Sequence, residues 1–314
     1  MASLTRYAHG ITAVDSALIR VGFDAVHVVA DGERAAIVDT GTGHSVAHIL
    51  EALSELAIDP DKVEYVFVTH VHLDHAGGAG ALLPSLPNAK VVLHPRGARH
   101  LIDPVKLIAG SVAVYGEEPF RRMYGDIAPI PEARVHVAGD GERFRLGQRD
   151  LEAIHTEGHA RHHYCLVDHA AQAIFTGDTF GVSYRELDTT NGPFIFPTTT
   201  PVHFDPPAAH ASIDRLLAYR PHAMFLTHYS RVAEVERLAR DLHVCLDGFV
   251  ALAKAHADAT DRTRRLQGEM TAYLYRRLDE HGVDSDSDRR RELLGPDIGL
   301  NVQGLEVWLE RCAQ

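Results

Sequence analysis

The chain has 314 residues, of which 45% are hydrophobic and 24% are charged, and its formal net charge is −12. This is the composition of a globular protein with one large domain, or a domain with a smaller addition. The acidic balance argues against nucleic-acid binding as the main task. No apolar run is long enough for a transmembrane helix, and the start lacks the apolar core of a signal peptide. Three widely separated cysteines do not suggest a disulfide framework, so we expect a cytoplasmic location.

Strands and helices are mixed over the first 230 residues. Alternating and buried-type apolar runs predict strands, and apolar residues at helical spacing predict helices. Ser45 can cap the first helix, and Asp59-Pro60 can end it. Residues 98–128 look helical but irregular. The predicted strands are 26–30, 35–39, 63–69, 90–94, 133–138, 143–146, 151–155, 164–167, 173–175 and 223–227, and the other predicted elements are a helix from about 74 to 83, a loop at 184–207 and a helix at 208–218.

After about residue 231 the pattern changes. The chain reads as helical to its end, except near residues 282–288. Strands mixed with helices, followed by helices alone, indicate an α+β body with a helical addition. We therefore predict a catalytic domain over residues 1–230 and a C-terminal helical region over residues 231–314.

The predicted strand 63–69 leads directly into a cluster of potential metal ligands. His70, His72, Asp74 and His75 occupy six consecutive positions. The chain contains 22 histidines, so chance pairs are expected. Four ligand-type side chains at a strand end are hard to explain as packing, because burying them without partners is costly. Imidazole and carboxylate suit Zn, Fe and Mn, so the cluster predicts a metal site, with Asp74 and His75 able to face a second ion.

Further carboxylates and imidazoles follow other predicted strands. Asp39 follows the strand 35–39, and His159 comes shortly after the strand 151–155. Asp178 follows the strand 173–175, and His228 ends the strand 223–227. Strand ends that meet loops are the usual places for catalytic groups held by a rigid scaffold. These residues can therefore complete the coordination.

Five motifs in order carry a resemblance to a known family. The sequence resembles the metallo-β-lactamase fold superfamily, which includes glyoxalase II, lactonases and persulfide dioxygenases, and the glyoxalase II-like branch is the nearest in arrangement. The resemblance covers about residues 10–230 and implies a four-layer αββα sandwich. The motifs are Val38-Asp39-Thr40-Gly41, His70-Val71-His72-Leu73-Asp74-His75, Thr156-Glu157-Gly158-His159, Gly177-Asp178-Thr179 and Thr227-His228.

The resemblance implies a ligand set and a chemistry. Two divalent ions are implied, with Zn favoured and Fe or Mn as alternatives. Asp39 would fix the ligand loop by hydrogen bonds. A metal-bridged hydroxide would cleave a small ester, thioester or lactone, and Asp74 would pass a proton to the leaving group. The first ion would be held by His70, His72 and His159, the second by Asp74, His75 and His228, and Asp178 would bridge them.

The substrate-binding positions match the family less well. Glyoxalase II carries a lysine and a tyrosine after the bridging aspartate, and residues 180–187 show no such pair. Lactonases of the superfamily carry a tyrosine there that hydrogen-bonds the substrate, and Tyr184 is the candidate for a catalytic contact. A small-molecule substrate with an apolar or aromatic acyl group is expected, with no nucleic-acid or membrane partner. The helical tail could cover the cleft or form a homodimer.

Two other classes of function are open. A persulfide dioxygenase uses one ferrous ion on two histidines and one carboxylate, which His70, His159 and Asp178 could supply. The other class is a binding protein on a degenerate scaffold, which the complete set of expected ligands disfavours. Metal content and oxygen uptake would separate the hydrolase from the oxygenase.

Overall fold

The computed structural model describes residues 2–199 and 201–313; Met1, Thr200 and Gln314 lie outside the described residues. The chain forms two compact units. Unit 1 comprises Met1–His155, His162–Gly177 and Pro221–Arg231, and unit 2 comprises Thr156–Arg161, Asp178–Arg220 and Val232–Gln314. Residues 178–220, which the sequence analysis placed with the first domain, thus lie in unit 2.

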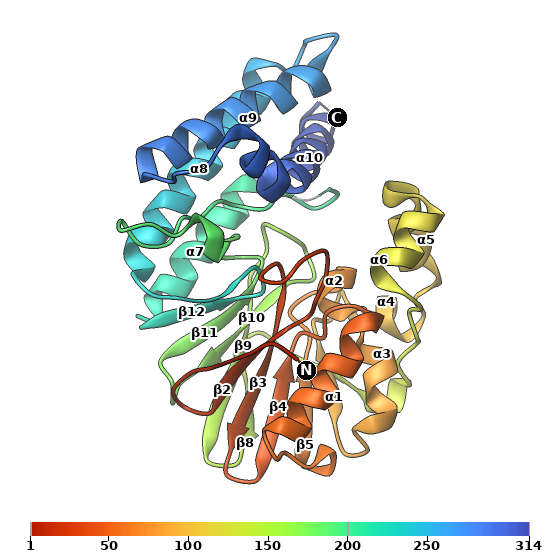
Figure 1. Ribbon diagram of the computed structural model, residues 1–314. Coiled ribbons are helices and arrows are strands. Elements are labelled where there is room, and N and C mark those ends of the chain that lie inside the picture. Colours follow the sequence, from red (N-terminus) through yellow and green to blue (C-terminus); the bar gives the residue numbers. More distant parts are fainter. Residues whose placement is uncertain (1, 200, 314) are drawn as a thin grey trace. The chain divides into compact units, whose positions relative to one another are not determined.

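Unit 1 contains a first sheet of seven strands in sequence order (Figure 1). Strands β1 to β4 pair antiparallel, and β4, β5, β6 and β7 pair parallel. The carboxyl ends of the parallel strands therefore meet at one edge of the sheet. The strands are β1 (Leu4–Arg6), β2 (Ile11–Asp15), β3 (Ala25–Asp31), β4 (Arg34–Val38), β5 (Val63–Phe67), β6 (Lys90–Leu93) and β7 (Val135–Val137).

The second sheet has six strands in the order β13-β12-β11-β10-β9-β8. Strands β8 to β11 pair antiparallel, whereas β11 and β12 are parallel. Strands β9, β11 and β12 therefore end at the same edge. The strands are β8 (Glu142–Leu146), β9 (Arg149–His155), β10 (Tyr164–Asp168), β11 (Ala173–Gly177), β12 (Ala223–Leu226) and β13 (Ser230–Val232).

The two sheets share an apolar core. Side chains from both sheets, such as Phe67 and Val92 from the first and Tyr164, Phe175 and Phe225 from the second, form one buried cluster. The opposite face of the first sheet forms another cluster with the helices of unit 1. A sheet buried on both faces explains why β4 reads as a continuous apolar run after Arg34.

The helices of unit 1 follow the strands of the first sheet. Helix α1 buries Ile49, Ala52 and Leu53 on one side. Ser45 occupies the predicted N-cap position, but its side chain makes no capping hydrogen bond to α1, because its hydroxyl accepts from the Thr42 N–H at 3.1 Å. The helices are α1 (Val46–Glu55), α2 (Leu73–Ala76), α3 (Ala79–Leu82), α4 (Ala98–Ile102), α5 (Val105–Tyr115) and α6 (Glu117–Tyr124).

Unit 2 is mainly helical. Its helices are α7 (Pro206–Ala218), α8 (Val235–Ala255), α9 (Arg262–His281) and α10 (Ser287–Cys312). Asn301 of α10 accepts hydrogen bonds from the Thr199 N–H and hydroxyl, which ties the loop before α7 to the C-terminal helix. Within the described ranges, none of the helices has the length and apolarity needed to cross a bilayer.

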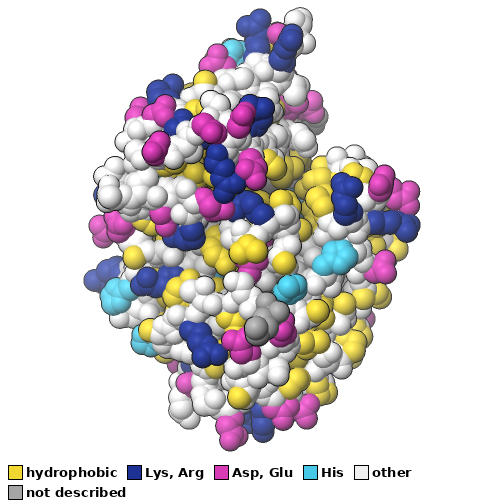
Figure 2. Space-filling model, viewed as in Figure 1, with side chains coloured by type: hydrophobic (Ala, Val, Ile, Leu, Met, Phe, Trp, Pro, Cys, Tyr) yellow, Lys and Arg dark blue, Asp and Glu magenta, His cyan; other side chains and the backbone are white. Residues whose placement is uncertain are grey.

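The predicted α+β sandwich with C-terminal helices is confirmed. The strand pattern supplies the two sheets, and the chain after β13 is helical. On the face shown in Figure 2, Lys and Arg side chains are interspersed with Asp and Glu. The net charge of −12 is therefore not concentrated in one acidic field on that face.

Candidate metal centre

One edge of the sandwich brings several strand ends together. Asp39 follows β4 and Thr69 follows β5, and these strands are parallel. Thr227 follows β12 of the second sheet, and its hydroxyl donates to the Asp39 carboxylate at 2.9 Å. This hydrogen bond joins the two sheets at the edge where the loops after β4, β5 and β12 begin.

Asp39 organises this edge. Its Oδ1 accepts the Thr69 N–H at 2.8 Å and the Thr69 hydroxyl at 2.9 Å. Its Oδ2 pairs with Nδ1 of His75 at 2.8 Å and accepts the Thr227 hydroxyl. Asp39 is 1% exposed and adopts φ 58°, a conformation that Asp tolerates better than most residues. The predicted hydrogen bonds from Asp39 to the ligand loop are therefore present.

The structure brings Asp74, His75 and His228 together. Oδ2 of Asp74 lies 3.7 Å from Nε2 of His75 and 3.4 Å from Nε2 of His228. One ligand atom from each residue lies within 4.8 Å of the others. His75 and His228 are buried, and Asp74 is partly exposed, so solvent can reach the group from the carboxylate side. Two imidazoles and a carboxylate could hold one metal ion.

The second nitrogen of each imidazole in this group has a partner. Nδ1 of His75 faces Asp39, and Nδ1 of His228 donates to the Phe23 carbonyl at 2.8 Å. A proton on each Nδ1 leaves the lone pair on each Nε2, which points to Asp74. Metal-binding histidines are oriented in this way, with the outer nitrogen held by a carboxylate or a carbonyl.

His70 and His72 form a second pair in unit 1. Nε2 of His70 lies 2.8 Å from Nδ1 of His72, so both nitrogens can reach one ion. Nδ1 of His70 lies 3.2 Å from the Thr69 hydroxyl, the group that also binds Asp39. The ligand loop is therefore connected to the same network as His75.

His159 and Asp178 lie together in unit 2. Nε2 of His159 is 3.4 Å from Oδ2 of Asp178, and Nδ1 of His159 is 3.3 Å from the Thr198 carbonyl. Both side chains are nearly buried. Their segments begin at the ends of β9 and β11, because Thr156 follows His155 and Asp178 follows Gly177.

Tyr184 is placed in unit 2 as a fully buried residue. Its hydroxyl donates to the carboxylate of Asp297 in α10, at 3.2 and 3.1 Å from the two oxygens. The proposed contact of Tyr184 with substrate stays a prediction. The hydrogen bond to Asp297 gives the phenol a structural role that the sequence did not indicate.

Two groups near Asp74, His75 and His228 were not predicted from the sequence. The Phe23 carbonyl holds His228, and Asp24 follows it as a fully buried carboxylate. Both precede β3, in a segment without a metal-binding motif. The proximity follows from contacts between distant segments, because the Ala25 N–H also donates to the Thr227 carbonyl at 2.9 Å.

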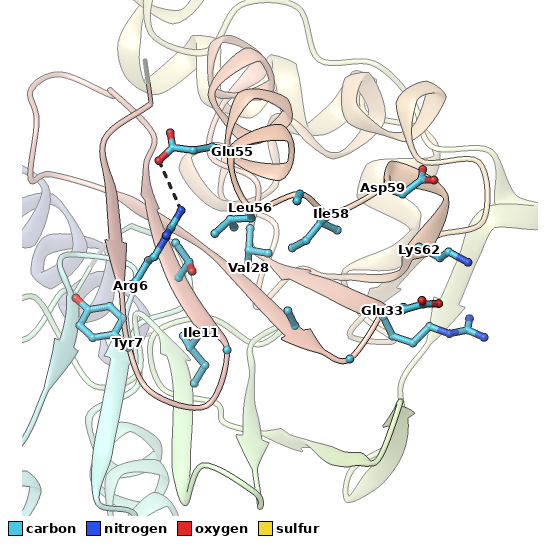
Figure 3. A pocket seen from close by; sticks show the side chains of 16 residues that line it. Arg6, Tyr7, Ile11, Val28, Glu33, Glu55, Leu56, Ile58, Asp59 and Lys62 are labelled. Atoms are coloured by element: carbon cyan, nitrogen blue, oxygen red, sulfur yellow. Dashed lines mark ion pairs between the residues drawn. The ribbon is translucent and has the colours of Figure 1, made fainter.

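A hollow of about 700 Å³ lies elsewhere in unit 1 (Figure 3). It is lined by residues of β1 to β4 and of the chain around the end of α1, and it includes Glu33 in the turn before β4. An ion pair between Arg6 and Glu55, 3.8 Å long, lies at its side. The hollow is at the opposite end of β4 from Asp39, so it is separate from the candidate centre.

Comparisons with known proteins agree with this arrangement. The chain is 30% identical over 211 residues to the metallo-beta-lactamase fold-containing protein ST1585 of Sulfurisphaera tokodaii, covering 65% of this chain and 71% of that protein. The crystal structure of ST1585 superimposes with a TM-score of 0.64 at 22% identity, covering 95% of this chain and 99% of that one.

A fungal enzyme matches a shorter part of the chain. The atrochrysone carboxyl ACP thioesterase of Emericella nidulans is 32% identical over 154 residues, which span 48% of this chain and only 38% of the thioesterase. The family model described as the metallo-beta-lactamase superfamily matches residues 19–228, which include every strand end described above. The chain therefore belongs to the metallo-beta-lactamase superfamily.

Proposed function

We propose that this protein is a metal-dependent hydrolase that cleaves a small ester, thioester or lactone. The observation that carries the proposal is the group formed by Asp74, His75 and His228, in which both imidazoles direct Nε2 toward one carboxylate. Packing alone does not require that arrangement. The donor set fits Zn, Fe or Mn, which accept imidazole and carboxylate together.

A second ion position belongs to the same proposal. His70 and His72 supply two nitrogens 2.8 Å apart. His159 and Asp178 leave β9 and β11 at the edge where Asp39 and Thr227 meet. We infer that these four residues would hold one ion and that Asp178 would be a ligand shared with the ion at Asp74, His75 and His228. Zinc is the favoured metal, with Fe or Mn as alternatives.

The ions and the residues of the chain would then have different roles in the hydrolysis. Two divalent ions, when bound, would supply Lewis acidity that lowers the pKa of water and polarises a carbonyl. Asp39 and the Phe23 carbonyl keep His75 and His228 in the tautomer that binds metal. The Asp74 carboxylate, partly exposed, can accept a proton and deliver it to the leaving oxygen or sulfur.

The chain next to Asp74 is apolar, which agrees with an apolar rather than an anionic acyl group. Leu73, which precedes Asp74, packs in a cluster with Phe120, Tyr124 and Ile127. Helix α5 contributes partly buried apolar side chains to this cluster, and none of its residues is fully buried. A thioesterase among the relatives supports a thioester as the substrate to test before the ester or the lactone.

The test is a hydrolysis panel with the metal-loaded protein. Acyl thioesters, p-nitrophenyl esters and lactones with short and long apolar acyl groups are compared, with elemental analysis of the same samples. Hydrolysis of one class that is lost after chelation, and is lost in His75→Ala, would support the proposal. Unchanged hydrolysis in Asp178→Ala, or one iron per chain with oxygen uptake on a persulfide, would contradict it and support the dioxygenase.

A further inference from the structure

Asp24 is a buried carboxylate that lacks the usual partners. It is 0% exposed, and among the described residues neither of its oxygens has a hydrogen bond of ordinary geometry. The Ser16 hydroxyl contributes only a weak interaction that lowers the pKa of Asp24. Burying a carboxylate without partners costs free energy, and native proteins rarely keep such a group without a reason.

The backbone on both sides of Asp24 places this residue near the group formed by Asp74, His75 and His228. The residue before it, Phe23, holds His228 through its carbonyl at 2.8 Å. The residue after it, Ala25, donates its N–H to the Thr227 carbonyl at 2.9 Å. Asp24 therefore sits between two residues that are bonded to the segment carrying His228.

The charges around Asp24 agree with this position. The pKa of Asp24 is raised to about 7, chiefly by burial, and the charge of Asp74 contributes in the same direction. The imidazoles of His228 and His75 act in the opposite direction. All three members of the ligand group are thus close enough to Asp24 to act on its charge.

We propose that the Asp24 carboxylate is a further metal-site residue, facing the ion held by Asp74, His75 and His228. The inference rests on the proposed metal-dependent function. A divalent cation at this position supplies the missing partner of a buried carboxylate. It also makes the position richer in oxygen, since two carboxylates then accompany two imidazoles, and such a set favours Mn or Fe more than histidines alone would.

A buried carboxylate with a structural task looks different in the same unit. Asp168 is also 0% exposed, but it lies 3.4 Å from the Arg149 guanidinium. It also accepts the N–H groups of Ala170 and Ala171, each at 3.1 Å. Asp168 therefore stabilises a turn and an ion pair, and it provides a matched control for Asp24.

The experiment compares Asp24→Asn and Asp24→Ser with Asp168→Asn in the full chain. Stability is measured by denaturant unfolding of the metal-free proteins and of the proteins loaded with Mn²⁺ or Zn²⁺. The number of ions per chain and their affinities are measured by elemental analysis and equilibrium dialysis. We expect the Asp24 variants to bind the ion at Asp74, His75 and His228 about 10- to 100-fold more weakly, as for groups that support metal ligands. Without metal they should be at least as stable as the parent, because an unpartnered carboxylate has been removed.

The control should behave in the opposite way. Asp168→Asn should lose stability with and without metal and keep the parental affinity for both ions. Parental affinity in the Asp24 variants, or destabilisation of their metal-free forms, would overturn the proposal, as would failure of both to fold when Asp168→Asn folds. If the parent protein itself binds no ion, the proposed metal-dependent function fails, and that result is distinct from a failure of Asp24 alone.

Discussion

The two ends of β4 differ in chemistry and in the space beside them. At the end before Arg34, unit 1 has a hollow of about 700 Å³, lined by mixed charges and apolar side chains. At the other end, Asp39 lies in a buried network of hydrogen bonds with Thr69, His75 and Thr227. The hollow has an ion pair with exposed side chains, whereas the buried polar groups lie where strands of both sheets end. One end therefore offers open space, and the other offers buried hydrogen-bonding groups.

The largest effect is expected from removing a predicted metal ligand at the Asp39 end of β4. His228→Ala should remove one nitrogen ligand and lower hydrolysis by more than about 100-fold, since even groups behind the ligands contribute 10- to 100-fold. It should also lower the metal content by about one ion per chain. Steady-state kinetics and elemental analysis measure both. Arg34→Ala, at the other end of β4, is the control and should leave kcat/KM within a factor of about two.

A smaller effect is expected when the hydrogen bonds of Asp39 are removed but the predicted metal ligands remain. Asp39→Ala removes the acceptor of the Thr69 hydroxyl, the Thr227 hydroxyl and the His75 ring. We expect about 3 kcal/mol lower stability, because buried donors lose their partner, and about 10- to 100-fold weaker metal binding. Denaturant unfolding and metal titration test this. Retained metal affinity with lost stability would mean that Asp39 serves folding only.

A pH experiment sharpens the comparison between the two ends. His27 of β3 lies in the core opposite Val38, and burial lowers its pKa from 6.5 to about 4. Between pH 6.5 and 4 the unfolded chain therefore binds a proton on His27 that the native state does not bind. The stability that the neutral His27 contributes is complete above pH 6.5 and declines as the pH falls toward 4. The loss amounts to about 3 kcal/mol. His27→Asn should flatten the pH dependence of metal-free unfolding between 6.5 and 4, and an unchanged slope would contradict this.

The smallest effect is expected beside the hollow. Arg6 and Glu55 form an ion pair whose side chains are 61% and 45% exposed. Exposed pairs of this kind contribute about 0–1 kcal/mol. Arg6→Ala should therefore change the unfolding free energy by less than about 1 kcal/mol and should leave hydrolysis unchanged. A large loss of activity in this variant would show that the hollow takes part in the reaction.

Much of the fold and of the ligand set was predictable from local patterns. The strand before His70 reads as a buried apolar run, and the structure has β5 at Val63–Phe67. The predicted helix over about 74–83 is wrong in detail, because it is divided into α2 and α3. The Gly78 N–H donates to the Gly41 carbonyl at 3.0 Å, and a side chain at Gly78 would clash with the Thr40 carbonyl. A contact between distant segments here prevails over helical spacing.

The features that could not be predicted all depend on pairing between distant segments. Asp24 has no motif, and its proximity to His228 follows from the hydrogen bonds of its neighbours Phe23 and Ala25 with His228 and Thr227. Tyr184 was selected by its place after Asp178, but its hydroxyl meets Asp297, which is far along the chain. Local periodicity cannot report such contacts, because each partner alone looks like an ordinary polar residue.

The hydrogen bond between Ala25 and Thr227 has a consequence for the order of assembly during synthesis. It joins a strand made early to a segment made after all of the first sheet. A growing chain that ends before β12 carries His70, His72 and His75, yet it lacks His228 and the Thr227 hydroxyl. The group of Asp74, His75 and His228 is therefore complete only after β12 has been made, so an ion that needs all three residues would bind late in synthesis and not to the nascent segment of His70 to His75.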